Sequence, residues 1–199
     1  NGLSRRFADA ADEYRDYLNA QLRRTLLKKR APLQFRTRLL ADKAAELVDM
    51  AQCDVLCIGC RNTAEIDYIR AKGARSVVGI DLYSESKDVL VMDMHSMTFP
   101  SDRFDAVYAS HSLEHAYDIG AVAKEIVRVA RSGALVALEV PLKYQTTAAD
   151  LHDFDSLPKL HAYFEPYASP VLWSDEQPAR SPLNPAGTPV GRMVFSVRK

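Results

Sequence analysis

A short apolar run that ends in a tight turn most limits what this chain can fold into. Residues 55–58 (Val-Leu-Cys-Ile) have strand length, and the turn from Gly59 leads into a helical pattern over residues 64–70. A second run of strand length, residues 76–80, ends at Asp81, 22 positions after Gly59. In doubly wound sheets an acid about 20 residues past such a turn accepts hydrogen bonds from a ribose diol. This order predicts a nucleotide-cofactor site at the ends of parallel strands.

Segments of strand character alternate with helical patterns from Cys53 onward. This alternation predicts an α/β fold with a doubly wound, mostly parallel seven-stranded sheet, covered by helices on both faces. We expect the last strand to return antiparallel at an edge of the sheet, and residues 175–189, rich in Pro and Ser, to form a loop. The seven expected strands are residues 54–58, 76–80, 89–92, 104–109, 134–140, 170–173 and 193–198.

Two further helical patterns follow the fourth and fifth expected strands. Residues 120–131 carry apolar side chains every three or four positions and end before Gly133, and residues 156–164 form a shorter helix. Only 12 positions separate Asp81 from Asp93. That is too short for a full crossover helix, so we expect a turn there.

The first 50 residues predict a helical preface to the main domain, which spans residues 51–199. Residues 7–30 have apolar side chains at helical spacing and end before Pro32, and residues 35–50 repeat the pattern. Seven basic residues and no acid occur between Arg23 and Arg38. They form either a solvated helix face or a surface for an anionic substrate or partner.

Composition excludes several broad classes of function. The 199 residues suit one domain of ordinary size, and 47% hydrophobic with 26% charged residues is average globular usage. A net charge of +0 gives no field that favours nucleic acid or an acidic membrane, so we expect a small-molecule substrate. No apolar run reaches the roughly 18 residues of a membrane-spanning helix, and the first 30 residues are too polar for a signal peptide. We therefore expect a cytoplasmic protein without a membrane partner; the oligomeric state is unknown from sequence.

Three cysteines, Cys53, Cys57 and Cys60, lie within eight positions. Their C-x3-C-x2-C spacing resembles the iron–sulfur motif of radical enzymes that cleave S-adenosylmethionine, in which three thiolates hold a cluster. Cys57, however, stands inside an expected buried strand, whereas cluster ligands need a loop. Free cysteines commonly behave as small buried hydrophobes. We expect packed thiols and no metal site, with the cluster as the alternative.

The third and fourth expected strands end in residues that narrow the prediction. Asp93 and Met94 follow the third strand, and the fourth leads through Ser110 into His111-Ser112-Leu113-Glu114-His115. Over roughly residues 55–141 the chain resembles a class I S-adenosylmethionine-dependent methyltransferase of the small, type 11-like group, whose fourth strand leads into a Leu-Glu-His turn. The resemblance implies a Rossmann-like methyltransferase fold, with S-adenosylmethionine as cofactor and S-adenosylhomocysteine as product.

The resemblance also implies roles for single residues. The turn of Gly59, Cys60 and Arg61 would lie under the methionine part of the cofactor. Asp81 with Leu82 would bind the ribose, and Asp93 with Met94 would address the adenine. Ser110, at the end of the fourth strand, completes the expected cofactor-binding set.

The first turn departs from the family's pattern at three positions. The family usually has an acid where Cys57 stands and glycines where Arg61 and Thr63 stand, so Gly59 alone remains of the glycine-rich turn. Arg61 either meets the cofactor's carboxylate or fills the pocket. The lost glycines motivate an alternative, a non-catalytic relative that serves as a binding or regulatory protein.

Methyl transfer is an in-line displacement, so the protein mainly aligns the reactants and excludes water. A general base is useful when the nucleophile must lose a proton, and His111 or His115 has a suitable intrinsic pKa. Tyr144 and His152 are candidates for contacts with the acceptor. No Asn-Pro-Pro-Tyr signature follows the fourth strand, which argues against methylation of exocyclic base or amide nitrogens.

The sequence therefore favours S-adenosylmethionine-dependent methyl transfer to a small-molecule acceptor. A nicotinamide-linked oxidoreductase would share the acid after the second strand. It has little support because residues 59–64 read Gly-Cys-Arg-Asn-Thr-Ala and do not fit G-x-G-x-x-G.

Overall fold

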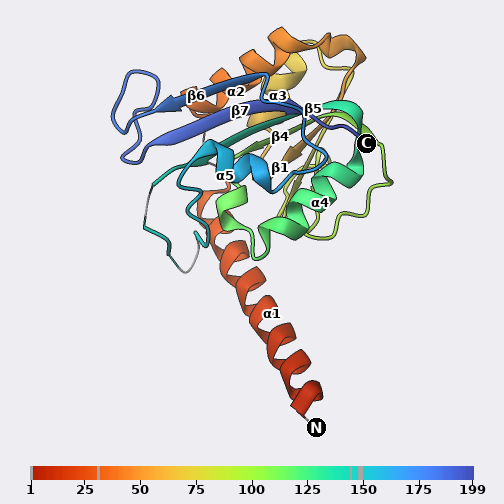
Figure 1. Ribbon diagram of the computed structural model, residues 1–199, viewed down its shortest axis with the longest axis vertical. Coiled ribbons are helices and arrows are strands. Elements are labelled where there is room, and N and C mark those ends of the chain that lie inside the picture. The colour runs from red at the N-terminus through yellow and green to blue at the C-terminus, as the bar shows by residue number, and fades with distance from the viewer. Residues whose placement is uncertain (1, 31, 144, 148–149) are drawn as a thin grey trace.

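The sheet of the computed structural model contains seven strands in the order β3-β2-β1-β4-β5-β7-β6 (Figure 1). The structure describes residues 2–30, 32–143, 145–147 and 150–199, and the side chains of these residues apart from residues 2–10 and 36. The strands are β1 (Asp54–Ile58), β2 (Ser76–Asp81), β3 (Val89–Val91), β4 (Phe104–Ser110), β5 (Ala130–Pro141), β6 (Trp173–Gln177) and β7 (Val190–Ser196).

Strands β1 to β5 are parallel, and β7 runs antiparallel to both of its neighbours, β5 and β6. The chain builds the sheet outward from β1 to β2 and β3, and then continues on the other side of β1 with β4. Ligands of open parallel sheets bind at such a reversal, outside the carboxyl ends of the strands. The predicted fold class is confirmed, and the fold points to the ends of β1 and β4 as the place for a site.

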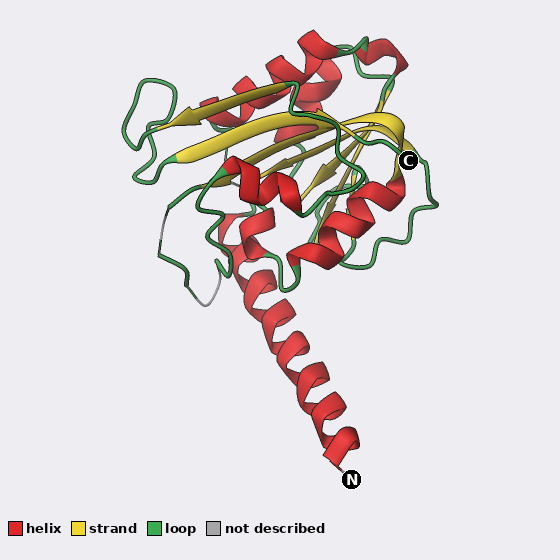
Figure 2. Cartoon of the chain, viewed as in Figure 1, coloured by secondary structure: helices red, strands yellow, loops and turns green. Residues whose placement is uncertain are grey.

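Helices cover both faces of the sheet (Figure 2). They are α1 (Gly2–Lys28), α2 (Phe35–Leu47), α3 (Ala64–Ala71), α4 (Ile119–Val129) and α5 (Leu157–Ala162), with short 3-10 turns η1 (Met50–Gln52) and η2 (Leu113–His115). Residues from α2 and α3 join one hydrophobic cluster with the sheet, and residues from α4 and α5 join another. Strand β1 serves both, because Leu56 and Ile58 face the second cluster while Val55 and Cys57 face the first.

Helix α1 extends away from the rest of the molecule (Figure 1). Its C-terminal half packs against the end of the sheet. There the Tyr17 hydroxyl donates to the His115 carbonyl at 2.8 Å, and the Thr25 hydroxyl donates to Asp81 at 3.1 Å. Among the described residues, no helix combines the length and apolar character needed to span a bilayer.

Two details of the sheet differ from the sequence prediction. The last strand is antiparallel as predicted, but it lies between β5 and β6 and is not at the edge. The edge strand is β6, which begins at Trp173 and runs into the predicted loop. Residues of β6 alternate between half-buried and exposed, and the sequence Ser-Asp-Glu within it is too polar to indicate a strand. By contrast, six of the seven residues of β7 are buried.

The predicted end of the helix before β5 and the predicted start of β5 are also wrong. Helix α4 ends at Val129 and β5 follows directly at Ala130, so Gly133 lies inside the strand and not at the end of the helix. Helix α4 begins at a cap, because the Asp118 carboxylate accepts from the Ala121 amide at 3.0 Å. No helix occurs over residues 82–88, as the short spacing between Asp81 and Asp93 predicts.

Candidate functional site

A pocket of about 600 Å³, part of it open to solvent, lies at the carboxyl ends of β1, β2 and β4, beside the residues that follow β3. It brings together six of the eight residues that the sequence assigns to the cofactor: Gly59, Arg61, Asp81, Leu82, Asp93 and Met94. Both candidate catalytic histidines, His111 and His115, line it as well. Cys60 and Ser110 line a second pocket on the other side of the Gly59 turn. The two pockets share Gly59, Arg61 and His111.

The first turn keeps a glycine-type backbone although two of its glycines are absent. Gly59 has a φ of +70°, and a Cβ there would lie 2.5 Å from the Ser112 Cβ, so a side chain does not fit. Arg61 has a φ of 59°, a left-handed conformation that costs energy for a residue with a Cβ. The Arg61 amide donates to the Asp81 carboxylate at 2.9 Å. The turn therefore points a backbone donor at the acid that ends β2.

Asp81 is buried and fixed by three donors. One oxygen accepts from the Leu82 amide at 2.7 Å and from the Thr25 hydroxyl at 3.1 Å, and the other accepts from Arg61. A carboxylate has about four lone-pair sites, so Asp81 retains capacity for a further donor.

Asp93 is bound by α1 and by its own loop. The Tyr14 hydroxyl donates to one oxygen, and the His95 amide donates to the other at 2.9 Å. Burial raises the pKa of Asp93, but hydrogen bonds from His95 and Tyr14 outweigh it and hold that pKa below its usual range. Tyr14 also packs edge-on against His95 and Tyr117, with ring centroids 5.7 and 5.2 Å away. This aromatic cluster encloses the Asp93 side of the pocket.

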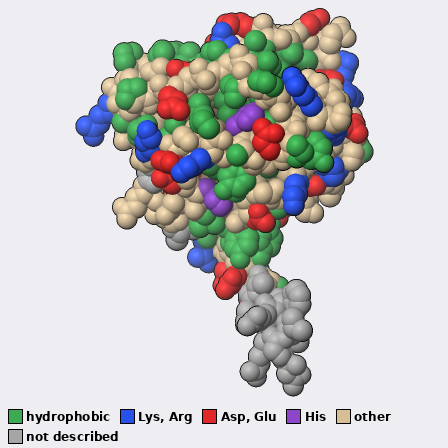
Figure 3. All heavy atoms as spheres, in the orientation of Figure 1, with side chains coloured by type: hydrophobic (Ala, Val, Ile, Leu, Met, Phe, Trp, Pro, Cys, Tyr) green, Lys and Arg blue, Asp and Glu red, His purple; other side chains and the backbone are tan. Residues whose placement is uncertain are grey.

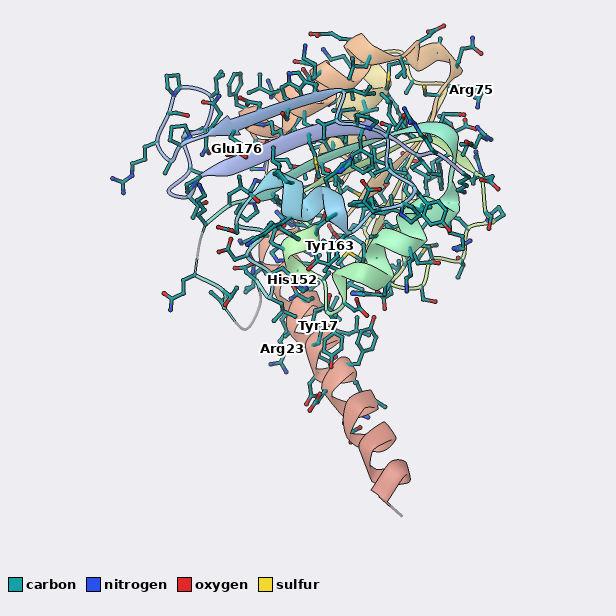
Figure 4. The ribbon with its side chains drawn as sticks, viewed as in Figure 1. Tyr17, Arg23, Arg75, His152, Tyr163 and Glu176 are labelled. Carbon is teal, nitrogen blue, oxygen red and sulfur yellow. The ribbon has the colours of Figure 1, made fainter. Side chains whose placement is uncertain are left out.

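The contribution of α1 to the pocket was missed by the sequence analysis. Five of its residues line the pocket: Tyr17, Leu18, Gln21, Arg24 and Thr25. In Figure 4 Tyr17 lies where α1 meets the rest of the molecule, and in Figure 3 hydrophobic side chains gather at the same place. The sequence held a signal for this contribution. Tyr14, Tyr17 and Leu18 begin one face of the helix, and the same face continues with the polar residues Gln21 and Thr25.

One of the seven basic residues, Arg24, lines the pocket and forms an ion pair of 2.6 Å with Asp150. Lys29 pairs with Glu85 at 2.5 Å near the same end of the sheet. Arg23 is exposed (Figure 4), and the Arg36 side chain lies outside the described residues.

His111 sits between two buried glutamates. Its Nδ1 lies 3.3 Å from Glu114 Oε1 and its Nε2 lies 3.1 Å from Glu139 Oε1. Burial lowers the pKa of His111, but its interactions with Glu114 and Glu139 outweigh burial and raise the pKa to about 9. At neutral pH His111 is therefore predominantly protonated, so it supplies positive charge and has no free lone pair to accept a proton.

His115 has a different partner. Its Nδ1 lies 2.8 Å from Asp150 Oδ1, the arrangement in which a carboxylate orients an imidazole. His152 is not among the residues that line the pocket; its amide donates to the Glu114 carbonyl at 3.2 Å, and its ring stacks on Phe154. Tyr144 lies outside the described residues.

A buried ionic network under the pocket was also not predicted. Glu139 and Arg192 are both fully buried and are joined by a hydrogen bond of 2.5 Å, and Arg192 bonds Asp175 at 2.7 Å. The Ser110 hydroxyl donates to Glu139 at 3.1 Å. Because these residues come from β4, β5, β6 and β7, no local sequence pattern reveals the network. It fixes Glu139 beside His111.

All three cysteines are buried and free. Cys57 lies within β1, and burial raises its pKa well above the usual value, so the group is a neutral thiol. Cys60 Sγ contacts the Ile80 carbonyl at 3.9 Å and therefore faces the protein interior. Within the described part of the chain, no set of three or more His, Cys, Asp or Glu side chains is placed to hold a metal ion.

Comparison with solved structures supports the fold assignment. A 1,6-didemethyltoxoflavin-N1-methyltransferase from Burkholderia thailandensis, solved with 1,6-didemethyltoxoflavin and S-adenosylhomocysteine, has a TM-score of 0.72 and 16% identity, over 97% of this chain and 90% of that one. A putative sarcosine dimethylglycine methyltransferase from Galdieria sulphuraria has a TM-score of 0.63 and 15% identity, over 81% and 85% of the two chains. The cyclase SpnF has a TM-score of 0.66 and 17% identity, over 85% and 83%.

Comparison by sequence identifies the central part of the chain. No curated protein matches. Residues 56–138, which hold the first turn, Asp81, Asp93 and both candidate histidines, match the family described as a methyltransferase domain. S-adenosylmethionine is the cofactor that this family implies. The central segment therefore carries a methyltransferase domain, and the sheet order gives the chain the Rossmann-like methyltransferase fold.

Proposed function

We propose that the protein transfers a methyl group from S-adenosylmethionine to a small-molecule acceptor. One observation carries the proposal: a single pocket joins the Gly59 turn, the carboxylates of Asp81 and Asp93, and the two histidines after β4. A small acceptor is consistent with the neutral net charge and with the bound molecule named for the Burkholderia thailandensis methyltransferase.

The residues of the pocket suit the chemical groups of this cofactor. Asp81 and Asp93 are acceptors for ribose and adenine donors. Arg61 offers positive charge to a carboxylate. The Ser112 hydroxyl is buried beside Gly59 and has no hydrogen-bond partner among the described residues, so it is available to a ligand. When bound, the cofactor supplies an electrophilic methyl group on a sulfonium.

The protein's own share of the reaction is alignment, exclusion of water and removal of a proton. Helix α1 covers the pocket from Tyr17 to Thr25 and limits access of water. Of the two histidines, His115 is the better general base, because Asp150 orients its ring and His111 is already protonated. His111 instead places a fixed positive charge between Glu114 and Glu139.

A non-catalytic binding protein is the second candidate. One observation favours it: Thr25 and Tyr14 of α1 already bond the two acids. Titration calorimetry with S-adenosylmethionine and S-adenosylhomocysteine is the first test. Binding of both, followed by methyl transfer to members of a panel of small oxygen, nitrogen and carbon nucleophiles, would support the enzyme. If neither cofactor binds, the proposal fails; binding without transfer to any acceptor would favour the binding protein.

A further inference from the structure

Glu65 is an acid in an unusual position. It lies in the first turn of α3 and lines the second pocket together with Cys60, Ser110 and His111. Its Oε2 is buried and has no hydrogen-bond partner among the described residues. A buried carboxylate oxygen without a partner is costly, so such a group either stays protonated or is kept for a charged ligand.

The surroundings of Glu65 hold charges of both signs. Burial has the largest effect and raises its pKa to about 8, since the two nearby cations do not compensate for it. The charged groups that act on it come from four places around it: Arg61 of the first turn, Asp81 of β2, His111 after β4 and Glu139 of β5. Glu65 in turn raises the pKa of the buried groups Cys57, Cys60 and Tyr108, so its carboxyl lies on their side of the sheet.

Without a ligand, Glu65 is therefore a mostly neutral acid at pH 7. One pH unit below a pKa of about 8, roughly nine-tenths of the group is protonated. A cation that reaches the second pocket would supply the missing partner.

We propose that Glu65 receives the ammonium group of the cofactor's amino-acid part, while Arg61 faces the carboxylate of the same part. The inference deepens the proposed function and rests on it. The residues of the Gly59 turn line the second pocket, and the methionine part is expected beside this turn. Ser110 and His111 complete the polar wall of the pocket. Near the carboxyl end of β1 the chain has Cys57 and no acid. The negative charge comes instead from α3, beside the same thiol.

The proposal has a proton balance that can be measured. An ammonium group forms a strong pair with a carboxylate but not with a neutral carboxylic acid. Binding therefore ionises Glu65 and releases its proton to the solvent, while the ammonium keeps all of its protons. At pH 7 close to one proton should leave for each S-adenosylhomocysteine that binds. His111 remains protonated before and after binding.

The test is titration calorimetry of the whole chain at pH 7 in buffers with different heats of ionisation. The ligands are S-adenosylhomocysteine, which has the amino-acid part, and 5′-methylthioadenosine, which lacks it. For the native protein we expect release of about one proton with the first ligand and none with the second. This measurement needs no variant and so does not depend on how a substitution folds.

The Glu65→Gln variant keeps the size of the side chain and removes its charge. It should weaken S-adenosylhomocysteine binding by about 10- to 100-fold, abolish the proton release, and leave 5′-methylthioadenosine affinity within about 2-fold. The matched control is Glu176→Gln on the exposed edge strand β6 (Figure 4), which should change nothing. Unchanged affinity and proton release in Glu65→Gln would overturn the inference and leave the proposed function standing. If neither ligand binds the native protein, the proposed function itself fails.

Discussion

Asp81 joins three parts of the molecule through one carboxylate. It accepts hydrogen bonds from the turn after β1 through Arg61, from its own strand end through Leu82, and from α1 through Thr25. Two of these donors are backbone amides, which orient the acid whether or not a ligand is bound. Asp81 is thus preorganised, and its substitution tests the site more directly than a change in a mobile side chain would.

Asp81→Ala should weaken S-adenosylhomocysteine binding by roughly 1 to 3 kcal/mol, the usual cost of losing hydrogen bonds to a charged group. Calorimetry measures the loss, and circular dichroism establishes that the variant folds. Asp153→Ala, at an exposed position, serves as the control and should bind normally. Unchanged affinity in Asp81→Ala would remove the ribose assignment.

His111 should make the stability of the protein depend on pH. Its pKa is about 9 in the folded chain and about 6.5 in an unfolded one, so its stabilising contribution is complete below about pH 6.5 and is lost as the pH rises through 9. The free energy of unfolding, measured in urea at pH 6, 7.5 and 9.5, should fall over this range. His111→Gln should show a smaller fall. Glu65, whose pKa is raised, also lowers stability as the pH rises from about 4.5 to 8. Parallel curves for the two proteins would contradict the assignment of a protonated His111.

Helix α1 shows what periodicity can and cannot predict about an element. Apolar spacing predicts its existence and its approximate end, since the helix stops at Lys28 ahead of Pro32. Periodicity does not say which surface an amphipathic helix will meet. Here the face with Tyr14, Tyr17 and Thr25 meets residues 56 to 98 positions later in the chain, so its partners are set by the tertiary structure alone.

Tyr14→Phe should loosen α1 without affecting the sheet. The variant keeps the ring packing against His95 and Tyr117 and removes the hydroxyl that bonds Asp93. Hydrogen exchange followed by mass spectrometry should show faster exchange over residues 11–28 and unchanged exchange in α4. Tyr163→Phe, at an exposed position after α5, is the control. Equal exchange in the native protein and Tyr14→Phe would mean that the hydroxyl contributes nothing to holding the helix.

At the scale of the whole molecule, local signals were enough for the parallel half of the sheet. Strands β1, β2 and β4 are largely buried, with β1 buried at all five positions, and the short β3 is an apolar run with two exposed residues. The antiparallel half, with β6 and β7, was harder to predict. Strand β6 is polar, and the position of β7 depends on pairing with residues far away in the chain, such as Glu139 and Arg192, which are 53 positions apart. The candidate cofactor acids were predictable because Asp81 ends β2 and Asp93 lies two residues after β3. Glu65, Glu114 and Glu139 were not, because a buried acid within an apolar pattern has no distinctive spacing.

The two N-terminal helices should differ in importance for folding. Leu40 and Ala41 of α2 belong to the core cluster beside β1, whereas none of the described side chains of α1, residues 11–28, belongs to either core cluster. We expect a chain without residues 1–30 to unfold cooperatively in urea but to bind S-adenosylhomocysteine weakly. A chain without residues 1–50 should lose cooperative unfolding, because the face of the sheet under α2 would be exposed. Cooperative unfolding of the shorter chain would show that α2 is dispensable.

The closeness of Gly59 to Ser112 links two turns that belong to different strands. The methylene of Ser112 fills the space that a side chain on Gly59 would need. The volumes at these two positions are therefore shared, and enlarging one requires shrinking the other. A methyl group added to the turn after β1 would push on the segment that carries His111 and His115. The turn after β1 and the segment after β4 are thus in direct steric contact, and a variant of either has to be designed together with the other.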